Sequence, residues 1–445
     1  MDRSKKKNEK IGLISLGCSK NRVDSEVILG LLKNNGYLLT QNPEEADIII
    51  INTCSFIEPA KREAVESILE MAQMKKKGRC RFLIVTGCLA QECGIKLFHE
   101  MPEVDALIGP GEMARIVEVI DQLNSAASKN AIHFLSRTPF LYDHSWPRIR
   151  TTRPHIAYIK ISDGCDHCCS YCLIPKLRGS YRERELESVV VEAKKLAREG
   201  VKEICLIAQD TTAFTRLSLL LERLASIEEG PWIRLLYTYP FSVDHALIDI
   251  MPKYPNVLSY LDIPLQHSNP RILKAMKRPS DIERIEKLIH YARSSIPDLV
   301  IRTTFMVGFP GETDDEFKHL MAFVQKMRFD HLGVFEYSRE RGTEAYHMPG
   351  QVSKRIKQKR YHKIMALQAD ISNEKNRSQL GRIVEVICDC PDPDQQGIII
   401  GRTKGQAPEI DGVTYIAGED LKTGEICRIR ITGSSVYDLE GIKVI

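Results

Sequence analysis

Short apolar runs alternate with amphipathic segments over residues 11–120. The runs IGLISLG, ADIIIIN and RFLIVTG are almost entirely apolar, as expected of strands that are buried on both faces of a parallel sheet. Between them, residues 24–33 and 58–77 carry apolar side chains at helical spacing, and the second segment has its acids early and its lysines late, which suits the helix dipole. The pattern predicts an α/β domain with a doubly wound parallel sheet at residues 9–124.

The pattern fades over residues 125–150, where a polar stretch with prolines indicates a connection between domains. A second alternating set then occupies residues 151–376, with helical patterns between its apolar runs and a long charged helix from about 353 to 376 at its end. Six strand–helix units predict an incomplete parallel (β/α)6 barrel. Its strand candidates are 157–162, 203–209, 232–238, 258–265, 300–309 and 331–338.

Residues 377–445 change character again. Four short apolar runs separated by turn residues predict a small all-β barrel of the oligonucleotide-binding type. This tail holds eight Lys plus Arg and eleven Asp plus Glu, a balance of −3. A module that binds RNA is expected to be basic, so the tail favours a basic protein partner, unless its acids are simply a solvated face. Contact with RNA stays open because the connection is basic at Arg148, Arg150 and Arg153.

The overall composition, with 43% apolar and 27% charged residues, is that of an ordinary globular protein. No apolar run approaches the ~18 residues of a membrane span, and the basic N-terminus is not followed by a signal-peptide pattern. We therefore expect a cytoplasmic protein without membrane contact. The net charge of +4 is too small to indicate a class of partner. The 13 cysteines make up about 3% of the chain, far below the ~8–10% of a disulfide scaffold. In a reducing compartment, cysteines that cluster point to metal binding or catalysis.

The segment GCDHCCSYC places Cys165, Cys169 and Cys172 at the spacing C-x3-C-x2-C. A four-iron cluster normally takes four thiolates, so three leave one iron open to a ligand. The segment follows the first barrel strand, at the end where barrel enzymes keep their active sites. Two alternatives stay open: a purely structural cluster, and a zinc site with Cys168 or His167 as its fourth ligand.

A second group of cysteines is dispersed along the N-terminal domain. Cys18, Cys54 and Cys88 each follow a predicted strand of the parallel sheet. Because the carboxyl ends of parallel strands form one ligand crevice, these thiols are expected to converge on a second three-cysteine cluster. The alternative is three unrelated buried cysteines.

Other candidate residues lie at the carboxyl ends of predicted barrel strands, on the same face of the barrel as the cysteine loop. The segment GFPGET, residues 308–313, follows the fifth barrel strand, and its glycines permit a close approach to a ligand. His267 and Asp210 also end strands there, and for His267 a structural and a functional role are equally open. The residues expected to contact a cofactor are Tyr171, Gly308, Gly311 and Glu312.

Taken together, these motifs resemble the radical S-adenosylmethionine (SAM) methylthiotransferases over nearly the whole chain. The segments LGCSKNRVDSE, NTCSFIEPAKREAVESI and SDGCDHCCSYCLIPKLRG look most like the RimO subfamily, which modifies an aspartate of small-subunit ribosomal protein twelve. The sister MiaB subfamily, which modifies an isopentenylated adenosine in tRNA, typically has Gln and Met where this chain has Ser19 and Lys20. One departure is a shortened loop after Phe214, where Thr215 and Arg216 lead directly into leucines, so no family contact is carried over to that loop.

The resemblance implies an N-terminal three-cysteine domain, a radical SAM core and a C-terminal TRAM domain. It implies two [4Fe-4S] clusters: one on Cys165, Cys169 and Cys172 that binds and cleaves SAM, and one on the N-terminal cysteines that carries the methylthio group. Both open irons would then face one cavity, with the sheet edge over the mouth of the barrel. The implied reaction adds a methylthio group to the β-carbon of the aspartate; the alternative is an adenosine in tRNA. An electron donor such as flavodoxin or ferredoxin is implied, whereas an iron–sulfur electron carrier would not cleave SAM.

Overall fold

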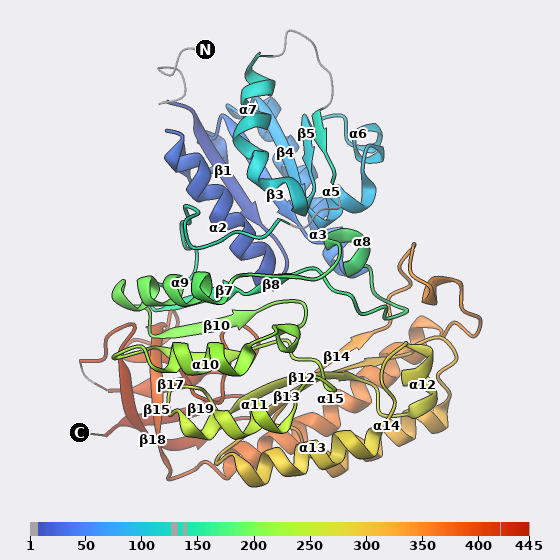
Figure 1. Ribbon diagram of the computed structural model, residues 1–445, viewed down its shortest axis with the longest axis vertical. Coiled ribbons are helices and arrows are strands. Elements are labelled where there is room, and N and C mark those ends of the chain that lie inside the picture. The colour runs from blue at the N-terminus through green and yellow to red at the C-terminus, as the bar shows by residue number, and fades with distance from the viewer. Residues whose placement is uncertain (1–7, 126–131, 137–139, 419, 445) are drawn as a thin grey trace.

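The computed structural model describes residues 8–125, 132–136, 140–418 and 420–444. Three units follow one another along the chain and pack together (Figure 1). The N-terminal α/β domain lies on one side of a central α/β unit, and a small closed β-barrel lies beside the amino ends of the central strands, beneath the left end of β10 in Figure 1. No helix among the described residues is both long enough and apolar enough to cross a membrane.

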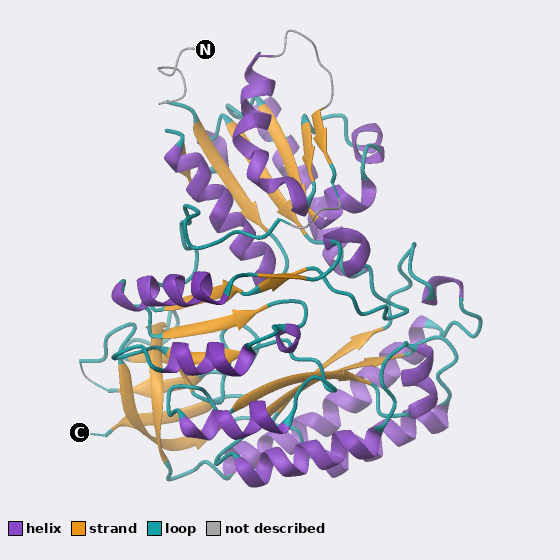
Figure 2. Ribbon diagram, in the orientation of Figure 1, coloured by secondary structure: helices purple, strands orange, loops and turns teal. Residues whose placement is uncertain are grey.

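The N-terminal domain is built on six parallel strands in the order β2-β1-β3-β4-β5-β6. Helices cover both faces of this sheet (Figure 2), so the predicted doubly wound domain is confirmed. The strands are β1 (Lys10–Ser15), β2 (Leu38–Thr40), β3 (Ile48–Thr53), β4 (Phe82–Gly87), β5 (Ala106–Ile108) and β6 (Ile132–Phe134). The helices are α2 (Ser19–Asn34), α3 (Glu58–Ala72), α4 (Met74–Lys77), α5 (Cys88–Cys93), α6 (Lys96–Glu100) and α7 (Ile116–Ser125).

The structure adds short elements that the pattern does not show, among them β2 and β5, and it differs from the pattern at three further points. The single helix expected over 58–77 is divided at Gln73 into α3 and α4. Strand β6 lies inside the stretch expected to be only a connection, because three residues are too few to show a strand period. Helix α2 begins at Ser19, five residues earlier than expected, because its first polar side chains are buried against the central unit and hide the amphipathic pattern.

The central unit contains six parallel strands in two hydrogen-bonded sheets, β11-β10-β7 and β12-β13-β14. An isolated bridge between Ile233 and Val257 joins the two sheets, and within the described residues no ladder pairs β14 with β7. The predicted incomplete (β/α)6 barrel is thereby confirmed. Its strands are β7 (Ile156–Lys160), β10 (Glu203–Ile207), β11 (Trp232–Leu235), β12 (Tyr260–Gln266), β13 (Val300–Val307) and β14 (His331–Glu336).

The main apolar core of the barrel lies between the strands and their outer helices. These helices are α9 (Leu186–Arg198), α10 (Leu217–Ala225), α11 (His245–Ile250), α13 (Ile282–Ser295), α14 (Asp314–Met327) and α15 (Lys354–Arg377), with the shorter α8 (Ile174–Arg178) and α12 (Pro270–Ala275). A two-stranded ribbon, β8 (Ser162–Asp163) with β9 (Arg182–Glu183), flanks the loop that carries Cys165, Cys169 and Cys172.

The inner face of the barrel is covered from two sides. Val23 and Val27 of α2 pack on Tyr158 and Tyr260, and Ala407 of the C-terminal unit joins the same cluster. Along β13 the outward positions are buried while the inward ones are only half-buried. The inward side chains of β13 therefore keep some contact with solvent.

The C-terminal unit is a closed five-stranded barrel in the order β15-β16-β17-β19-β18, as predicted. The strands are β15 (Ile383–Pro391), β16 (Ile398–Thr403), β17 (Thr414–Ala417), β18 (Ile426–Ser434) and β19 (Leu439–Lys443). The loop between β16 and β17 reaches the amino ends of the central strands, where Asp411 accepts a hydrogen bond of 2.6 Å from the Tyr260 hydroxyl.

The acidic balance of this unit overstates the negative charge of its surface. Asp389 is buried between Arg402 and His155, and Asp411 is buried against the barrel. Glu409 reaches across to Arg22 of α2. Several of the acids that suggested a docking surface therefore hold the domains together.

Candidate active site

The N-terminal cysteines lie at one edge of the first sheet. Cys18 is the N-cap residue of α2, Cys54 follows β3 directly, and Cys88 begins α5 directly after β4. Gly17 has a φ of +89°, and a Cβ there would lie 2.5 Å from the Cβ of Cys54, so glycine is required for the first loop to press against the second. The thiols of all three cysteines are close enough to interact electrostatically.

The second group, Cys165, Cys169 and Cys172, lies on the loop after β8. The N–H of Cys172 donates to the carbonyl oxygen of Cys169 at 3.0 Å, and the N–H of Ile174 donates to the Cys172 Sγ at 3.4 Å. The guanidinium of Arg278 lies 3.9 Å from the Cys169 Sγ, and Cys165 interacts electrostatically with both Cys169 and Cys172.

The two residues considered as a fourth zinc ligand are placed elsewhere. Cys168 is exposed, and its thiol faces the Asp166 carbonyl oxygen at 3.7 Å. The His167 ring stacks on Tyr239 at 3.8 Å and its Nε2 lies 2.7 Å from Asp210. Neither residue therefore extends the group of Cys165, Cys169 and Cys172 to a fourth ligand in this structure.

Burial sets the protonation of the cysteines. It raises the pKa of the Cys88 and Cys172 thiols to about 12 and that of Cys165 to about 11, so these groups are protonated near neutral pH and metal binding must release their protons. Arg178 opposes this shift at Cys88, and Arg278 does so at Cys172. Clustered thiols with N–H and guanidinium donors aimed at sulfur fit iron–sulfur ligation, in which such hydrogen bonds tune the cluster.

The two cysteine groups are in contact through their neighbours. Cys88 packs against Leu173 and Leu177, the first of which directly follows Cys172. The strands of the N-terminal sheet run toward the barrel (Figure 1). The carboxyl edge of that sheet therefore faces the loop that carries Cys165, Cys169 and Cys172, as the family resemblance implies.

A buried network of charges lies between the two groups. The Lys160 ammonium lies 2.5 Å from Asp24 and 2.6 Å from Asp163. The Arg178 guanidinium binds the same carboxylates at 3.0 and 2.9 Å, and it also contacts Asn21 at 2.5 Å. Asp24 lies on the helix capped by Cys18, and Asp163 lies two residues before Cys165. The network therefore connects the segments that carry both cysteine groups.

Removing one carboxylate of this network is expected to destabilise the protein. In Asp24→Asn, Lys160 and Arg178 would share Asp163 alone, and leaving a buried charge unpaired costs about 3–5 kcal/mol. Urea unfolding measures the change. Asp315→Asn is the matched control, because Asp315 and Lys318 form an ion pair on the surface and such pairs contribute about 0–1 kcal/mol. Equal stability of the two variants would contradict this account.

The loop 308–313 lies beside the cysteine loop. Phe309 belongs to an apolar cluster against which Tyr171 packs, so the structure brings these two predicted regions together. Gly308 has a φ of +72°, and a Cβ there would lie 2.3 Å from Lys357. Gly311 has a φ of +80° with only Arg271 within 4 Å of such a Cβ, which leaves this part of the loop more open.

The Glu312 carboxylate is turned into its own loop. It accepts hydrogen bonds from the N–H groups of Gly308 and Phe309 and lies 3.2 Å from the Arg360 guanidinium. Glu312 is only 4% exposed. Its observed contacts hold the shape of the loop, and any contact with a ligand would come from the loop backbone.

Burial gives Glu312 a pH-dependent effect on stability. It raises the pKa of this carboxyl from 4.5 to about 7, with Glu316 adding to the shift and Arg360 opposing it. Between these values the folded chain binds a proton that the unfolded chain does not, so this group's contribution to stability falls as the pH rises. Relative to Glu312→Gln, the wild type is expected to lose about 2 kcal/mol between pH 5.5 and 8. Urea unfolding at the two pH values tests this, and a constant difference would refute it.

The histidine and aspartate at the other strand ends have local roles. His267 is fully buried, and its Nδ1 accepts the Asn269 N–H at 2.9 Å. Burial lowers the pKa of His267 to about 3, so the ring stays neutral, which favours the structural interpretation. Asp210 caps the short turn 211–213 and holds His167.

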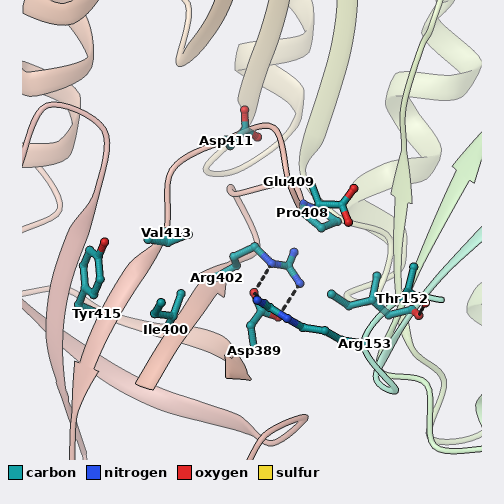
Figure 3. A pocket seen from close by; sticks show the side chains of 11 residues that line it. Thr152, Arg153, Asp389, Ile400, Arg402, Pro408, Glu409, Asp411, Val413 and Tyr415 are labelled. Carbon is teal, nitrogen blue, oxygen red and sulfur yellow. Dashed lines mark hydrogen bonds and ion pairs between the residues drawn. The ribbon is translucent and has the colours of Figure 1, made fainter. Parts of the chain in front are cut away.

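A separate cavity of about 410 Å³ lies where the central barrel meets the C-terminal unit. Arg402 and Asp389 pair within it (Figure 3). Its lining includes Ile156, the first residue of β7, whereas the cysteine loop follows the carboxyl end of the same strand. The cavity is therefore at the opposite end of the barrel from both cysteine groups.

Sequence reasoning missed the charged network and the two arginines beside the thiols. Arg178 and Arg278 are distant in sequence from most of their partners, and only the fold brings them together. The one signal in the sequence was the run of polar residues at the start of α2, which interrupts an otherwise apolar pattern.

Comparison with known families divides the chain in the same way. A model of the Uncharacterized protein family UPF0004 matches residues 10–109. The Radical SAM superfamily model matches residues 159–324, and the TRAM domain model matches residues 380–444.

Curated relatives match over nearly the full length. Proteins named "Ribosomal protein uS12 methylthiotransferase RimO" from Desulforamulus reducens and Geobacter sulfurreducens are both 46% identical to the chain, over 97% of it and 98% of each relative. The one from Clostridioides difficile is 44% identical over the same shares.

Solved structures share the fold at low identity. The radical S-adenosylmethionine methyltransferase TsrM from Kitasatospora setae has a TM-score of 0.55 at 15% identity, and the match covers 74% of this chain and 73% of that one. The cobalamin-dependent radical enzyme OxsB has a TM-score of 0.51 at 13% identity, covering 82% and 56%. At these identities the likeness concerns the fold alone.

Proposed function

The chain belongs to the RimO family of ribosomal protein uS12 methylthiotransferases, and we propose that it transfers a methylthio group to the β-carbon of an aspartate in uS12. The observation that carries this proposal is the pair of cysteine groups that face each other across one buried charge network. A single group would suffice to cleave SAM, whereas the transfer of sulfur needs a second site close to the first.

The cofactors of this family are two [4Fe-4S] clusters and SAM. We assign one cluster to Cys165, Cys169 and Cys172, which would also hold SAM, and the other to the N-terminal cysteines, with Cys18, Cys54 and Cys88 as its ligands. When bound, these groups supply the electron, the radical that removes a hydrogen atom, and the methylthio group. SAM contacts are assigned to Tyr171 and to the backbone of Gly308 and Gly311, with Glu312 bracing that loop.

The protein's own part is to position the reactants and to shield them from water. Arg278 and the Ile174 N–H hold the sulfur atoms of Cys169 and Cys172. Arg178 brings positive charge to Cys88, and through Asp24 and Asp163 it fixes the distance between the two cysteine groups. Leu173 and Leu177 exclude water from the space beside Cys88.

The remaining partners follow from this function. The electron would come from a small redox protein such as flavodoxin or ferredoxin. The reaction would take place in the cytoplasm, where uS12 is made and assembled. Contact with RNA is expected only if the substrate is uS12 within the ribosomal subunit. The candidate contacts are Arg150, which is half-buried and pairs with Glu199 at the end of α9, and Arg153, which is exposed and pairs with Asp389 of the C-terminal unit.

A competition experiment separates uS12 from tRNA as the substrate. Purified uS12 and total tRNA are offered together to the reconstituted enzyme with SAM labelled on its methyl group. The label is expected in uS12, on one aspartate found by tandem mass spectrometry. Label in a nucleoside of the digested tRNA, with none in uS12, would overturn the proposed substrate in favour of the MiaB-like alternative.

A further inference from the structure

Lys20 is a buried cation at the start of α2, two residues after Cys18. Its side chain is only 8% exposed. The ammonium lies 3.2 Å from the centre of the Tyr237 ring, and the neighbouring Ser19 Oγ lies 3.3 Å from the Tyr237 hydroxyl. Cation–π contact places the ammonium without neutralising its charge.

The other buried cations of this region are paired with carboxylates. Lys160 and Arg178 share Asp24 and Asp163, and Arg148 lies between Glu26 and Glu192. No carboxylate of the described chain lies within 4 Å of the Lys20 ammonium. Asp262 acts on it only at longer range, and its carboxylate is held by the Tyr237 N–H at 2.9 Å. A buried charge without a partner is costly, so this position is suited to receive an anion.

The surroundings of Lys20 belong to the lumen of the barrel. Helix α2 packs on the inner faces of the strands through Val23 and Val27, and Lys20 lies about one turn earlier on the same helix. The inward side chains of β13 are only half-buried, so this face of the barrel keeps some contact with solvent. Tyr237 itself has a φ of +61°, and such strain in a non-glycine residue is found where the surrounding structure holds a functional group in place.

From these contacts we propose that Lys20 binds the carboxylate of the uS12 aspartate that receives the methylthio group. This assignment rests on the proposed function. In aspartate the β-carbon is bonded directly to the carboxyl carbon, so fixing the carboxylate fixes the reacting carbon within one bond. Cys18, assigned to the cluster that carries the methylthio group, is two residues away on the same turn. The ammonium thus selects an acidic residue over an amide or an adenine ring, neither of which offers it a negative charge.

Binding of two forms of uS12 tests the assignment. Intact fluorescently labelled uS12 and a form with Asn in place of the modified aspartate are titrated against the full-length enzyme. The wild type is expected to bind the Asp form about ten- to a hundredfold more tightly than the Asn form, as is typical of hydrogen bonds to charged groups. Lys20→Met should weaken binding of the Asp form by a similar factor and bind both forms equally, whereas Lys20→Arg should keep part of the preference.

Lys33→Met is the matched control, because Lys33 is exposed near the other end of the same helix. It should bind like the wild type, and thermal unfolding of both Met variants checks that Lys20→Met is folded. In turnover, Lys20→Met should raise KM for uS12. If folded Lys20→Met still prefers the Asp form as the wild type does, the assignment to Lys20 is wrong although the enzyme acts on uS12. If the wild type does not modify uS12 at all, the proposed function fails, and this assignment fails with it.

Discussion

Replacing Cys18, Cys54 and Cys88 together by alanine is expected to abolish methylthio transfer to uS12 while SAM cleavage continues near the wild-type rate. The reason is the separation of the two cysteine groups: the substituted thiols lie on the N-terminal sheet, whereas the loop after β8 and its donor Arg278 are untouched. Iron content should fall from about eight to about four atoms per chain. Mass spectrometry of 5′-deoxyadenosine and of uS12 measures the two activities separately.

Cys93→Ala is the control for this variant, because Cys93 lies in the same domain at the far end of the helix that begins with Cys88. It should keep both activities and the full iron content. If the triple variant still methylthiolates uS12, the N-terminal cysteines are not the sulfur-carrying site, and the function of that domain has to be assigned anew.

Replacing Cys165, Cys169 and Cys172 by alanine is expected to reduce both activities to background. The resemblance assigns SAM binding to this loop, and no other group among the described residues combines three thiols with the end of a barrel strand. The variant should form no 5′-deoxyadenosine on reduction, with or without uS12, and it should retain about four iron atoms in the N-terminal domain.

The matched control is Cys168→Ala in the same loop. Cys168 is exposed and turned toward the Asp166 carbonyl, so its loss should leave iron content and SAM cleavage as in the wild type. A fall in both after Cys168→Ala would show that the fourth thiol of the loop is a ligand and would reopen the zinc alternative.

The architecture could be predicted because each unit has its own local pattern. The fully apolar runs of the parallel strands and the turn-separated runs of the small barrel are properties of consecutive residues, and so is the spacing of Cys165, Cys169 and Cys172. Cys18, Cys54 and Cys88 could be grouped despite their separation, because the carboxyl ends of parallel strands share one edge.

The start of α2 and the buried charge network could not be predicted, because they depend on contacts between domains that no local sequence pattern records. The first turn of α2 was missed because Lys20 and Asn21 are polar yet buried, and Tyr237 and Arg178 of the central unit contact them. The same is true of Arg178, which binds residues more than 150 positions earlier. Buried polar residues that break an amphipathic pattern are therefore the places where local reasoning fails and where this site is built.

In the acidic tail, by contrast, the sequence suggested a surface feature that the structure reduces. The count of charged residues in the tail gives a balance of −3, but Asp389 and Asp411 are buried, where they pair with Arg402 and with the Tyr260 hydroxyl. A charge count weighs every residue as if it were exposed. The preference for uS12 over tRNA therefore depends on the family and on the site, and no longer on the charge of the tail.

Whether this protein methylthiolates uS12 is measured directly by the intact mass of uS12 from cells with and without its gene. We expect uS12 from the parent strain to carry one methylthio group that is missing in the deletion strain. Restoring the wild-type gene should restore the mass, and restoring the Cys18, Cys54 and Cys88 triple variant should not. An unchanged mass of uS12 in the deletion strain would contradict the account.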